Sequence, residues 1–215
     1  MIQLYTFFRS SAAYRVRIAL NLKGLPYDAV PVHLLRGGGE QHAPGYTQLN
    51  PTQLIPTLVD GSLTLGQSLA ILEYLEEAYP TPALLPDDAG GRARVRAVSM
   101  SIACDIHPLN NLRVLQYLER ELKVDEAAKS RWYQHWIILG FSALETMLRS
   151  SDATGAFCHG EAPSMADCCL VPQVANARRF EIALDDFPTI CRIDANCAEL
   201  PAFRQALPQN QPDAM

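Results

Sequence analysis

Residues 2–20 read IQLYTFFRSSAAYRVRIAL, and this stretch decides the fold. Aliphatic and aromatic side chains mix with polar ones over Ile2–Phe7, which predicts a strand. A helix is predicted over residues 10–23, because apolar side chains follow at helical spacing and Gly24 offers a left-handed stop. A strand that passes directly into a helix is therefore the first unit of the chain.

Two serines, Ser10 and Ser11, stand where the strand gives way to the helix. A serine there accepts a hydrogen bond from a first-turn amide, and the same end of the helix attracts negative charge. A thiolate or carboxylate would gain hydroxyl donors, amide donors and the helix dipole together. The alternative is a plain helix cap, with Arg15 and Arg17 on the solvated surface of the next turn.

Length and composition indicate a soluble globular protein of one large or two small domains. The chain has 215 residues, of which 48% are hydrophobic and 19% charged, and its net charge is −5. No basic run favours a nucleic-acid partner. No apolar run reaches membrane-spanning length, and the N-terminus enters a strand rather than a cleavable signal. We therefore expect a cytoplasmic protein without a membrane partner.

The cysteines indicate neither a disulfide framework nor a metal site. None of the six forms a C-x-x-C pair, and their spacing matches no common zinc module. In a reducing compartment we expect buried, reduced thiols and no metal. They are Cys104, Cys158, Cys168, Cys169, Cys191 and Cys197.

The rest of the first eighty residues predicts a mixed sheet. Residues 27–32 form a second strand, parallel to the first and at an edge because of Pro31. Asp60-Gly61 predicts a hairpin between two further strands. Pro56 opens the third strand, and a cis bond before it would expose the backbone of Ile55 to an extended ligand.

A helix over residues 69–79 follows Gln67-Ser68, which gives a second helix start suited to an anion. Prolines and glycines then mark a boundary between residues 79 and 91. We predict one domain over residues 1–82, a linker over residues 83–87, and an all-helical domain over residues 88–215.

The second domain is predicted to contain several helices. The first is one long helix over residues 92–122, bent at Pro108, and the second covers residues 125–148. Ser164 and Asp167 are spaced as a cap for a buried helix. Shorter helices are predicted over residues 188–197 and 201–206.

A series of motifs runs along nearly the whole chain. The motifs are Arg9-Ser10-Ser11, Arg15-Val16-Arg17-Ile18-Ala19-Leu20, Leu49-Asn50-Pro51, Ile55-Pro56-Thr57-Leu58, Gln67-Ser68-Leu69-Ala70-Ile71, Pro80-Thr81-Pro82, Pro108-Leu109, Asn111-Leu112, Ala166-Asp167, Leu170–Ala177 and Arg179-Phe180. Together, and in this order, they resemble the cytosolic glutathione transferases, and within them the zeta class of maleylacetoacetate and maleylpyruvate isomerases. The resemblance implies an α/β thioredoxin-like N-terminal domain, an all-α C-terminal domain and a homodimer.

The resemblance implies glutathione as cofactor and a small diacid as substrate. It assigns catalysis to Ser10, Ser11 and Arg15, and the binding of a dianionic substrate to Arg9 and Arg179, because a planar guanidinium pairs with carboxylates. Arg15 as a structural ion-pair partner stays an equal alternative. The implied glutathione site consists of Ser10, Ser11, Gln41, Ile55, Gln67, Ser68, His107 and Asn111.

The chain departs from the family's Ser-Ser-Cys signature at one position, Ala12. Because the reacting sulfur belongs to glutathione, the serines and the helix start can still stabilise it. Alanine at this position excludes a mixed disulfide between glutathione and residue 12.

The implied function is glutathione-dependent isomerisation of maleylacetoacetate to fumarylacetoacetate. Maleylpyruvate isomerisation in gentisate degradation is the nearest alternative. A general glutathione transferase or dehalogenase is a broader one. A non-catalytic binding module of this fold is a fourth, since the fold alone does not fix a function.

Overall fold

The computed structural model describes residues 1–214, which divide into two compact units. The first unit contains Met1–Leu84 and the segment that begins at Ala198, and the second contains Leu85–Cys197. The division after Leu84 falls in the predicted linker. The C-terminal segment, by contrast, was expected in the helical domain, and it differs because helix α9 (Pro201–Ala206) packs on α1 (Ser11–Leu22).

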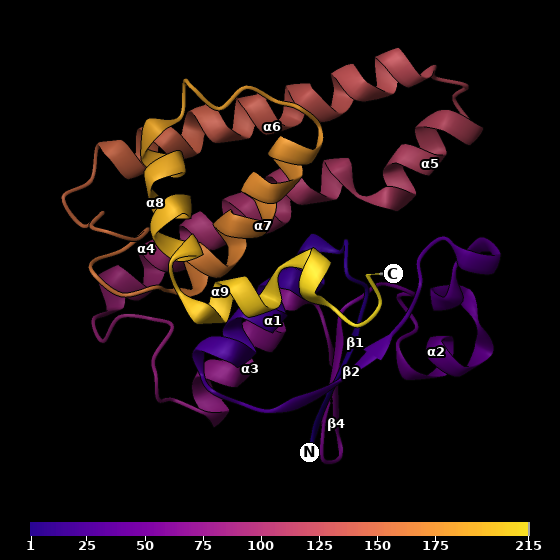
Figure 1. The fold of residues 1–215 in the computed structure, drawn as a ribbon, viewed down its shortest axis with the longest axis horizontal. Coiled ribbons are helices and arrows are strands. Elements are labelled where there is room, and N and C mark those ends of the chain that lie inside the picture. The colour runs from indigo at the N-terminus through magenta and orange to yellow at the C-terminus, as the bar shows by residue number, and fades with distance from the viewer. Residues whose placement is uncertain (215) are drawn as a thin grey trace. The chain divides into compact units, whose positions relative to one another are not determined.

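The first unit is built on a four-stranded mixed sheet (Figure 1). Its order is β2-β1-β3-β4, with β1 parallel to β2 and the other neighbours antiparallel, as the sequence predicted. Strand β2, which ends at Pro31, lies at an edge, where a missing amide donor is tolerated. The strands are β1 (Ile2–Thr6), β2 (Tyr27–Pro31), β3 (Thr57–Asp60) and β4 (Leu63–Gly66).

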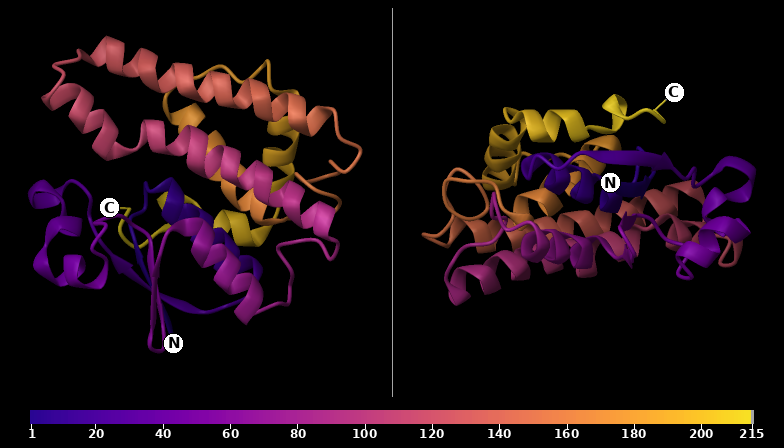
Figure 2. Two further views of the ribbon diagram at one scale, coloured as in Figure 1. Left: turned by 180° about the vertical axis from the view of Figure 1, so that it is seen from behind. Right: turned by 90° about the horizontal axis from the view of Figure 1, so that it is seen from below.

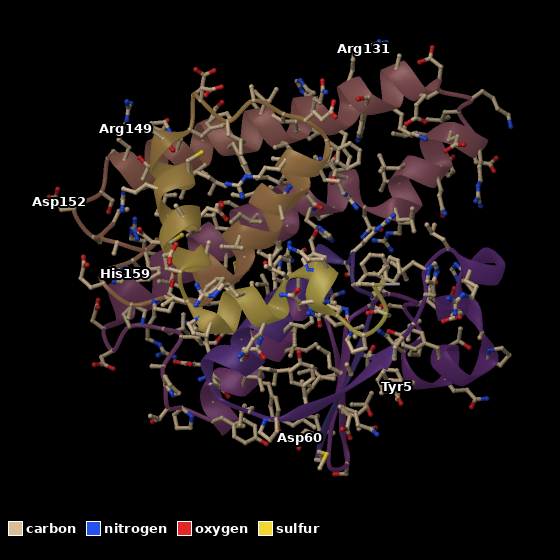
Figure 3. The ribbon with its side chains drawn as sticks, in the orientation of Figure 1. Tyr5, Asp60, Arg131, Arg149, Asp152 and His159 are labelled. Atoms are coloured by element: carbon tan, nitrogen blue, oxygen red, sulfur yellow. The ribbon has the colours of Figure 1, made fainter. Side chains whose placement is uncertain are left out.

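The β3–β4 hairpin turns one residue later than predicted. Asp60 pairs with Leu63, so the turn residues are Gly61 and the serine after it, and Gly61 takes a φ of 59°. Asp60 stands near the hairpin tip (Figure 3) and accepts hydrogen bonds from the hydroxyls of Tyr74 and Tyr79. These bonds hold the pKa of Asp60 below its ordinary value.

Helices cover both faces of this sheet. Helices α1 and α3 (Ser68–Ala78) lie on one side and α2 (Pro44–Leu49) on the other, as the two opposite views show (Figures 1 and 2). Gly24 has a φ of 64° just beyond α1, which confirms the predicted stop. Short 3-10 turns complete the unit: Arg36–Gly38, Glu40–His42 and Pro208–Asn210.

Helix α1 has almost no solvated face, because α3 and α9 both pack against it. Arg15 and Arg17 are only 2% and 0% exposed, so the expectation that they lie on the solvated surface is wrong. The surrounding core consists of Leu4, Val16, Ile18, Ala19, Leu20, Leu58, Ile71, Leu72 and Leu75.

The second unit is all-helical, as predicted. Helices α5 and α6 run side by side as an antiparallel pair (Figure 2), and α4 packs with α7. The helices are α4 (Ala89–Met100), η3 (Ser101–Ile106), η4 (His107–Asn110), α5 (Leu112–Arg120), α6 (Glu126–Arg149), α7 (Met165–Arg179) and α8 (Pro188–Ala198).

The single helix predicted over residues 92–122 is wrong. The chain passes through a π turn and a 3-10 turn and becomes extended at Asn111, where φ is −66° and ψ is 146°. Pro108 has no amide donor to continue an α-helix. The Asn111 side chain then caps α5 by accepting a hydrogen bond from the amide of Arg113 at 3.2 Å.

Helix α7 starts with the predicted cap. The Ser164 amide and hydroxyl donate to the Asp167 carboxylate at 2.7 and 2.8 Å, and the Cys158 amide donates to it at 2.8 Å. Burial nevertheless raises the pKa of Asp167. The cap joins the buried backbone of Cys158 to the helix that it starts.

All six cysteines are free, as expected, but two are not buried. Cys104 is exposed and Cys191 is partly exposed, because each lies on an outer side of its helical segment. Burial raises the pKa of Cys158 and Cys168, so these thiols stay protonated. Within residues 1–214, no helix is long and apolar enough to cross a membrane.

Candidate active site

Three of the predicted binding segments meet at one edge of the sheet. Strand β4 runs in the same direction as β1, since both are antiparallel to β3. Tyr5, Thr57 and Gly66 form one row across the three strands. Just beyond this row lie Ser10 after β1, Ile55 before β3 and Ser68 after β4.

Ser10 is the N-cap of α1. Its backbone is extended, and its Oγ accepts a hydrogen bond from the amide of Ala13 at 3.2 Å. A hydroxyl that accepts in this way keeps its own proton for donation. Ser10 is half-buried, whereas Ser11 is 7% exposed.

The first turn of α1 suits an anion. It contains no acidic side chain, and the amides at the start of a helix of this length point outward with the positive end of the dipole. Ala12 is half-buried there and contributes no thiol. The hydroxyl of Ser10 and this helix end together form a set of donors for a negatively charged sulfur.

Arg17 holds the loop that leads into Ser10. Its guanidinium donates to the carbonyl oxygens of Phe7 and Phe8 at 3.4 and 3.2 Å, and to the Thr6 hydroxyl at 3.0 Å. It also donates to the carbonyl oxygen of Ala206 at 3.2 Å. Burial lowers the pKa of Arg17 to about 10, so it stays charged at neutral pH. The sequence analysis did not assign this role, although the apolar residues around Arg17 were a signal of burial.

Ile55 is held by its neighbours on both sides. The Ile55–Pro56 peptide is cis, the alternative that the sequence left open. The Tyr46 hydroxyl and the Asn50 amide donate to the Leu54 carbonyl oxygen at 2.6 and 2.8 Å. Both side chains also contact the Thr57 hydroxyl, each at 2.9 Å. The Ile55 backbone is thus fixed outside the strand ladder, which begins at Thr57.

Helix α3 also begins with a serine, but here Gln67 is the N-cap and Ser68 is the first helical residue. Ser68 is 6% exposed, and its Oγ accepts a hydrogen bond from Nη1 of Arg15 at 3.1 Å. Gln67 is exposed and has a φ of 63°, a left-handed conformation that is uncommon outside glycine. Arg15 therefore lies beneath Ser68, and the strained residue before it presents its side chain to solvent.

Gln41 belongs to a short chain of polar side chains. Its Nε2 lies 3.0 Å from Nε2 of His42, and Nδ1 of His42 lies 2.6 Å from Oε1 of Gln53. The two ring nitrogens of His42 thus contact the side-chain amides of Gln41 and Gln53 and join them in one polar chain. Gln41 is 7% exposed. The sequence analysis selected Gln41 and missed His42 and Gln53, whose polar type alone gave no signal.

Arg9 and Arg179 lie in different units, and both are exposed. The Arg9 guanidinium carbon lies 5.0 Å from the centroid of the Phe8 ring. That of Arg179 lies 5.0 Å from the centroid of the Phe180 ring, which stacks on Tyr133. Both guanidinium groups are thus supported on one face by an aromatic ring.

His107 and Asn111 belong to the helical unit. His107 begins the 3-10 turn η4 and is half-buried. Asn111 uses its side-chain oxygen to cap α5, which leaves its amide group as a donor. Among the described residues, no group of histidine, cysteine and acidic side chains could hold a metal ion.

Comparisons with known proteins show which family this chain belongs to. A family profile described as "Glutathione S-transferase, N-terminal domain" matches residues 4–83. A probable maleylacetoacetate isomerase of Vibrio cholerae is 54% identical, over 98% of this chain and 97% of its own length. A maleylpyruvate isomerase structure, described as a bacterial glutathione S-transferase of the zeta class, is 51% identical with a TM-score of 0.96, over 99% of this chain and all of the other. This chain belongs to the zeta class of glutathione transferases.

A second solved structure shows which ligands a zeta-class relative takes. The maleylacetoacetate isomerase of Methylobacterium extorquens AM1 contains bound malonate and glutathione, and it is 40% identical to this zeta-class transferase. Its TM-score is 0.95, with 99% of each chain covered. The confirmed fold and family leave the individual site residues as predictions.

Proposed function

We propose that this zeta-class transferase isomerises a maleyl diacid from cis to trans with glutathione as cofactor, and that maleylacetoacetate is its substrate. The sheet edge that gathers Ser10, Ile55 and Ser68 supports this proposal most directly. Relatives named maleylacetoacetate isomerase match almost the full chain. A relative of 51% identity is named maleylpyruvate isomerase, so maleylpyruvate is the second candidate substrate.

The residues at the sheet edge fit glutathione. The tripeptide carries a thiol, a free α-amino acid end and a peptide backbone, and the edge offers one feature for each. The α1 start with Ser10 suits the thiolate, the α3 start with Ser68 suits the γ-glutamyl carboxylate, and the Ile55 backbone suits the cysteinyl unit. Gln41 is proposed to bind the glycyl end.

When bound, glutathione supplies a thiolate that adds reversibly to the substrate double bond, so that this bond can rotate. Ser10 and the helix start hold the sulfur anionic, because hydroxyl and amide donors favour the charged form. Arg9 binds a substrate carboxylate and places positive charge near the carbonyl oxygen, where negative charge develops. No proton needs to be gained or lost overall.

Three residues of the helical unit receive proposed roles as well. Arg179 binds a substrate carboxylate, since its guanidinium is exposed and supported by Phe180. His107 and Asn111 contribute to glutathione binding.

A homodimer is also proposed. The helical unit exposes Met100, Ile138, Leu139 and Met147 by 49, 45, 54 and 39%, on helices α4 and α6, and a second copy would cover such side chains. Sedimentation velocity tests the proposed homodimer. A protein that stays monomeric at every concentration measured would contradict it.

The decisive experiment measures turnover of maleylacetone, maleylpyruvate and dichloroacetate in parallel. We expect isomerisation of the two maleyl compounds with glutathione, and none with S-methylglutathione, which has no thiol. A chain that isomerises neither compound contradicts the proposal. Retention on a glutathione resin without any turnover would indicate a binding module instead.

A further inference from the structure

The C-terminal segment contacts the loop that precedes Ser10. The Phe8 amide donates a hydrogen bond to Oδ2 of Asp213 at 2.9 Å, across almost the full length of the chain. Helix α9, which leads to this segment, is fixed to α1 by a hydrogen bond from Asn21 to the Ala202 carbonyl oxygen at 2.9 Å. Asp213 therefore reaches the loop from a firmly attached element of the same unit.

The two polar groups of the Phe8 backbone are held by opposite charges. Its amide donates to the Asp213 carboxylate, and its carbonyl oxygen accepts from Nη2 of Arg17 at 3.2 Å. The neighbouring Phe7 carbonyl oxygen accepts both from Arg17 at 3.4 Å and from the Ser10 amide at 2.9 Å. A short hydrogen-bonded path thus connects Asp213 to Ser10.

The Asp213 carboxylate makes its hydrogen bond to this loop. Its Oδ1 is buried and has no hydrogen-bond partner among residues 1–214. The residue as a whole is only partly buried, and its charge interacts favourably with that of Arg17. This arrangement stabilises one position of the loop.

We propose that Asp213 is a positioning residue for the thiolate site. Its carboxylate fixes Phe8, and through this loop it sets where the Ser10 hydroxyl and the first turn of α1 meet the sulfur of glutathione. The inference rests on the proposed function, because it takes Ser10 as the group that contacts the sulfur.

The test compares D213N and D213A with wild type and with D28A, which removes an exposed carboxylate from the edge strand. Thiolate absorbance against pH gives the pKa of bound glutathione, and steady-state kinetics give kcat and KM. Asparagine still accepts from the Phe8 amide but without charge, and alanine does not accept. We expect kcat to fall about threefold in D213N and about tenfold in D213A, because small misplacements at a reacting centre are costly.

The pKa of the bound thiol should rise in the same order, while D28A matches wild type in both readouts. If D213N melts at a lower temperature than wild type but keeps the wild-type thiol pKa and kcat, the inference is overturned. If D213A does not fold, D213N carries the test. Failure of the proposed function differs from this outcome, because wild type itself would then show no glutathione-dependent isomerisation.

Discussion

Arg15 and Ser68 join the two helices that begin at the active-site edge: Nη1 lies 3.1 Å from Oγ, and both side chains are buried. Because Arg15 is 2% exposed, we expect it to act on ligands through Ser68. The serine hydroxyl accepts from the arginine, so its own proton is available for a carboxylate. This prediction assigns Arg15, which the resemblance placed in catalysis, to the second proposed anion site instead.

Replacing Arg15 with lysine should weaken glutathione binding more than turnover. Lysine keeps the charge but loses the planar geometry that orients Ser68. We expect KM for glutathione to rise about tenfold, the worth of one hydrogen bond to a charged group, and kcat to change less. Initial rates at varied glutathione check this, with the exposed R113K as control. A large fall in kcat at unchanged KM would instead indicate that Arg15 takes part in the chemical step.

The two serines should differ in their effect on the sulfur. The Ser10 hydroxyl is half-buried and polarised by the Ala13 amide, whereas Ser11 is buried. We expect S10A to raise the pKa of bound glutathione by about 1 to 2, the worth of a hydrogen bond to a charged group. It should also cost about 1 kcal/mol of stability through the lost cap. A larger pKa rise in S11A than in S10A, measured by thiolate absorbance, would reverse the assignment.

A cysteine at position 12 should make the site reactive toward oxidised glutathione. The first turn of α1 lowers the pKa of a thiol, so A12C should form a mixed disulfide that alanine excludes. The exposed Cys104 is removed in both proteins, so that A12C/C104S is compared with C104S alone. Intact-mass spectrometry should show one added glutathione only in the former, and absence of this adduct from both proteins would argue against an activated helix start.

The sheet and the helix start at Ser10 could be predicted because local patterns determine them. Strand 2–6, the serine cap and the stop at Gly24 each depend on neighbouring residues. The apolar neighbours of Arg15 and Arg17 hinted at burial, but what covers these side chains could not be predicted, since Arg15 contacts α3 and Arg17 contacts α9, which are both distant in sequence. The break at Asn111 was missed because Pro108 marks a disruption without showing whether the helix bends or ends.

Arg17 should matter for stability more than any surface arginine. R17M removes donors from the carbonyl oxygens of Phe7, Phe8 and Ala206 inside the protein. Buried groups left without partners should lower the free energy of unfolding by about 3 to 5 kcal/mol, measured by urea denaturation. The exposed R113M should change it by less than about 0.5 kcal/mol. Equal effects of both substitutions would show that the Arg17 hydrogen bonds contribute nothing to the free energy of unfolding.

Because of Asp60, the stability of the folded chain should depend on pH in the acid range. Hydrogen bonds from Tyr79 and Tyr74 lower its pKa in the folded chain, so the stabilisation is present above the ordinary aspartate pKa and is lost as pH falls through the lowered value. Wild type should melt above D60N at neutral pH, and the difference should shrink as the pH falls below the ordinary aspartate pKa. Thermal melts across this range test it, with D28N as the exposed control. A pH-independent difference would mean that the charge of Asp60 is not involved.

The first unit is assembled from two segments that lie far apart in the sequence, and the later one supplies the contact of Asp213 with the β1–α1 loop. During synthesis the ribosome delivers every strand of the sheet before α9 emerges. Until then Arg17 lacks the Ala206 carbonyl oxygen as a hydrogen-bond partner. Emergence of α9 and Asp213, rather than completion of the sheet, is the moment at which this unit can reach its final form.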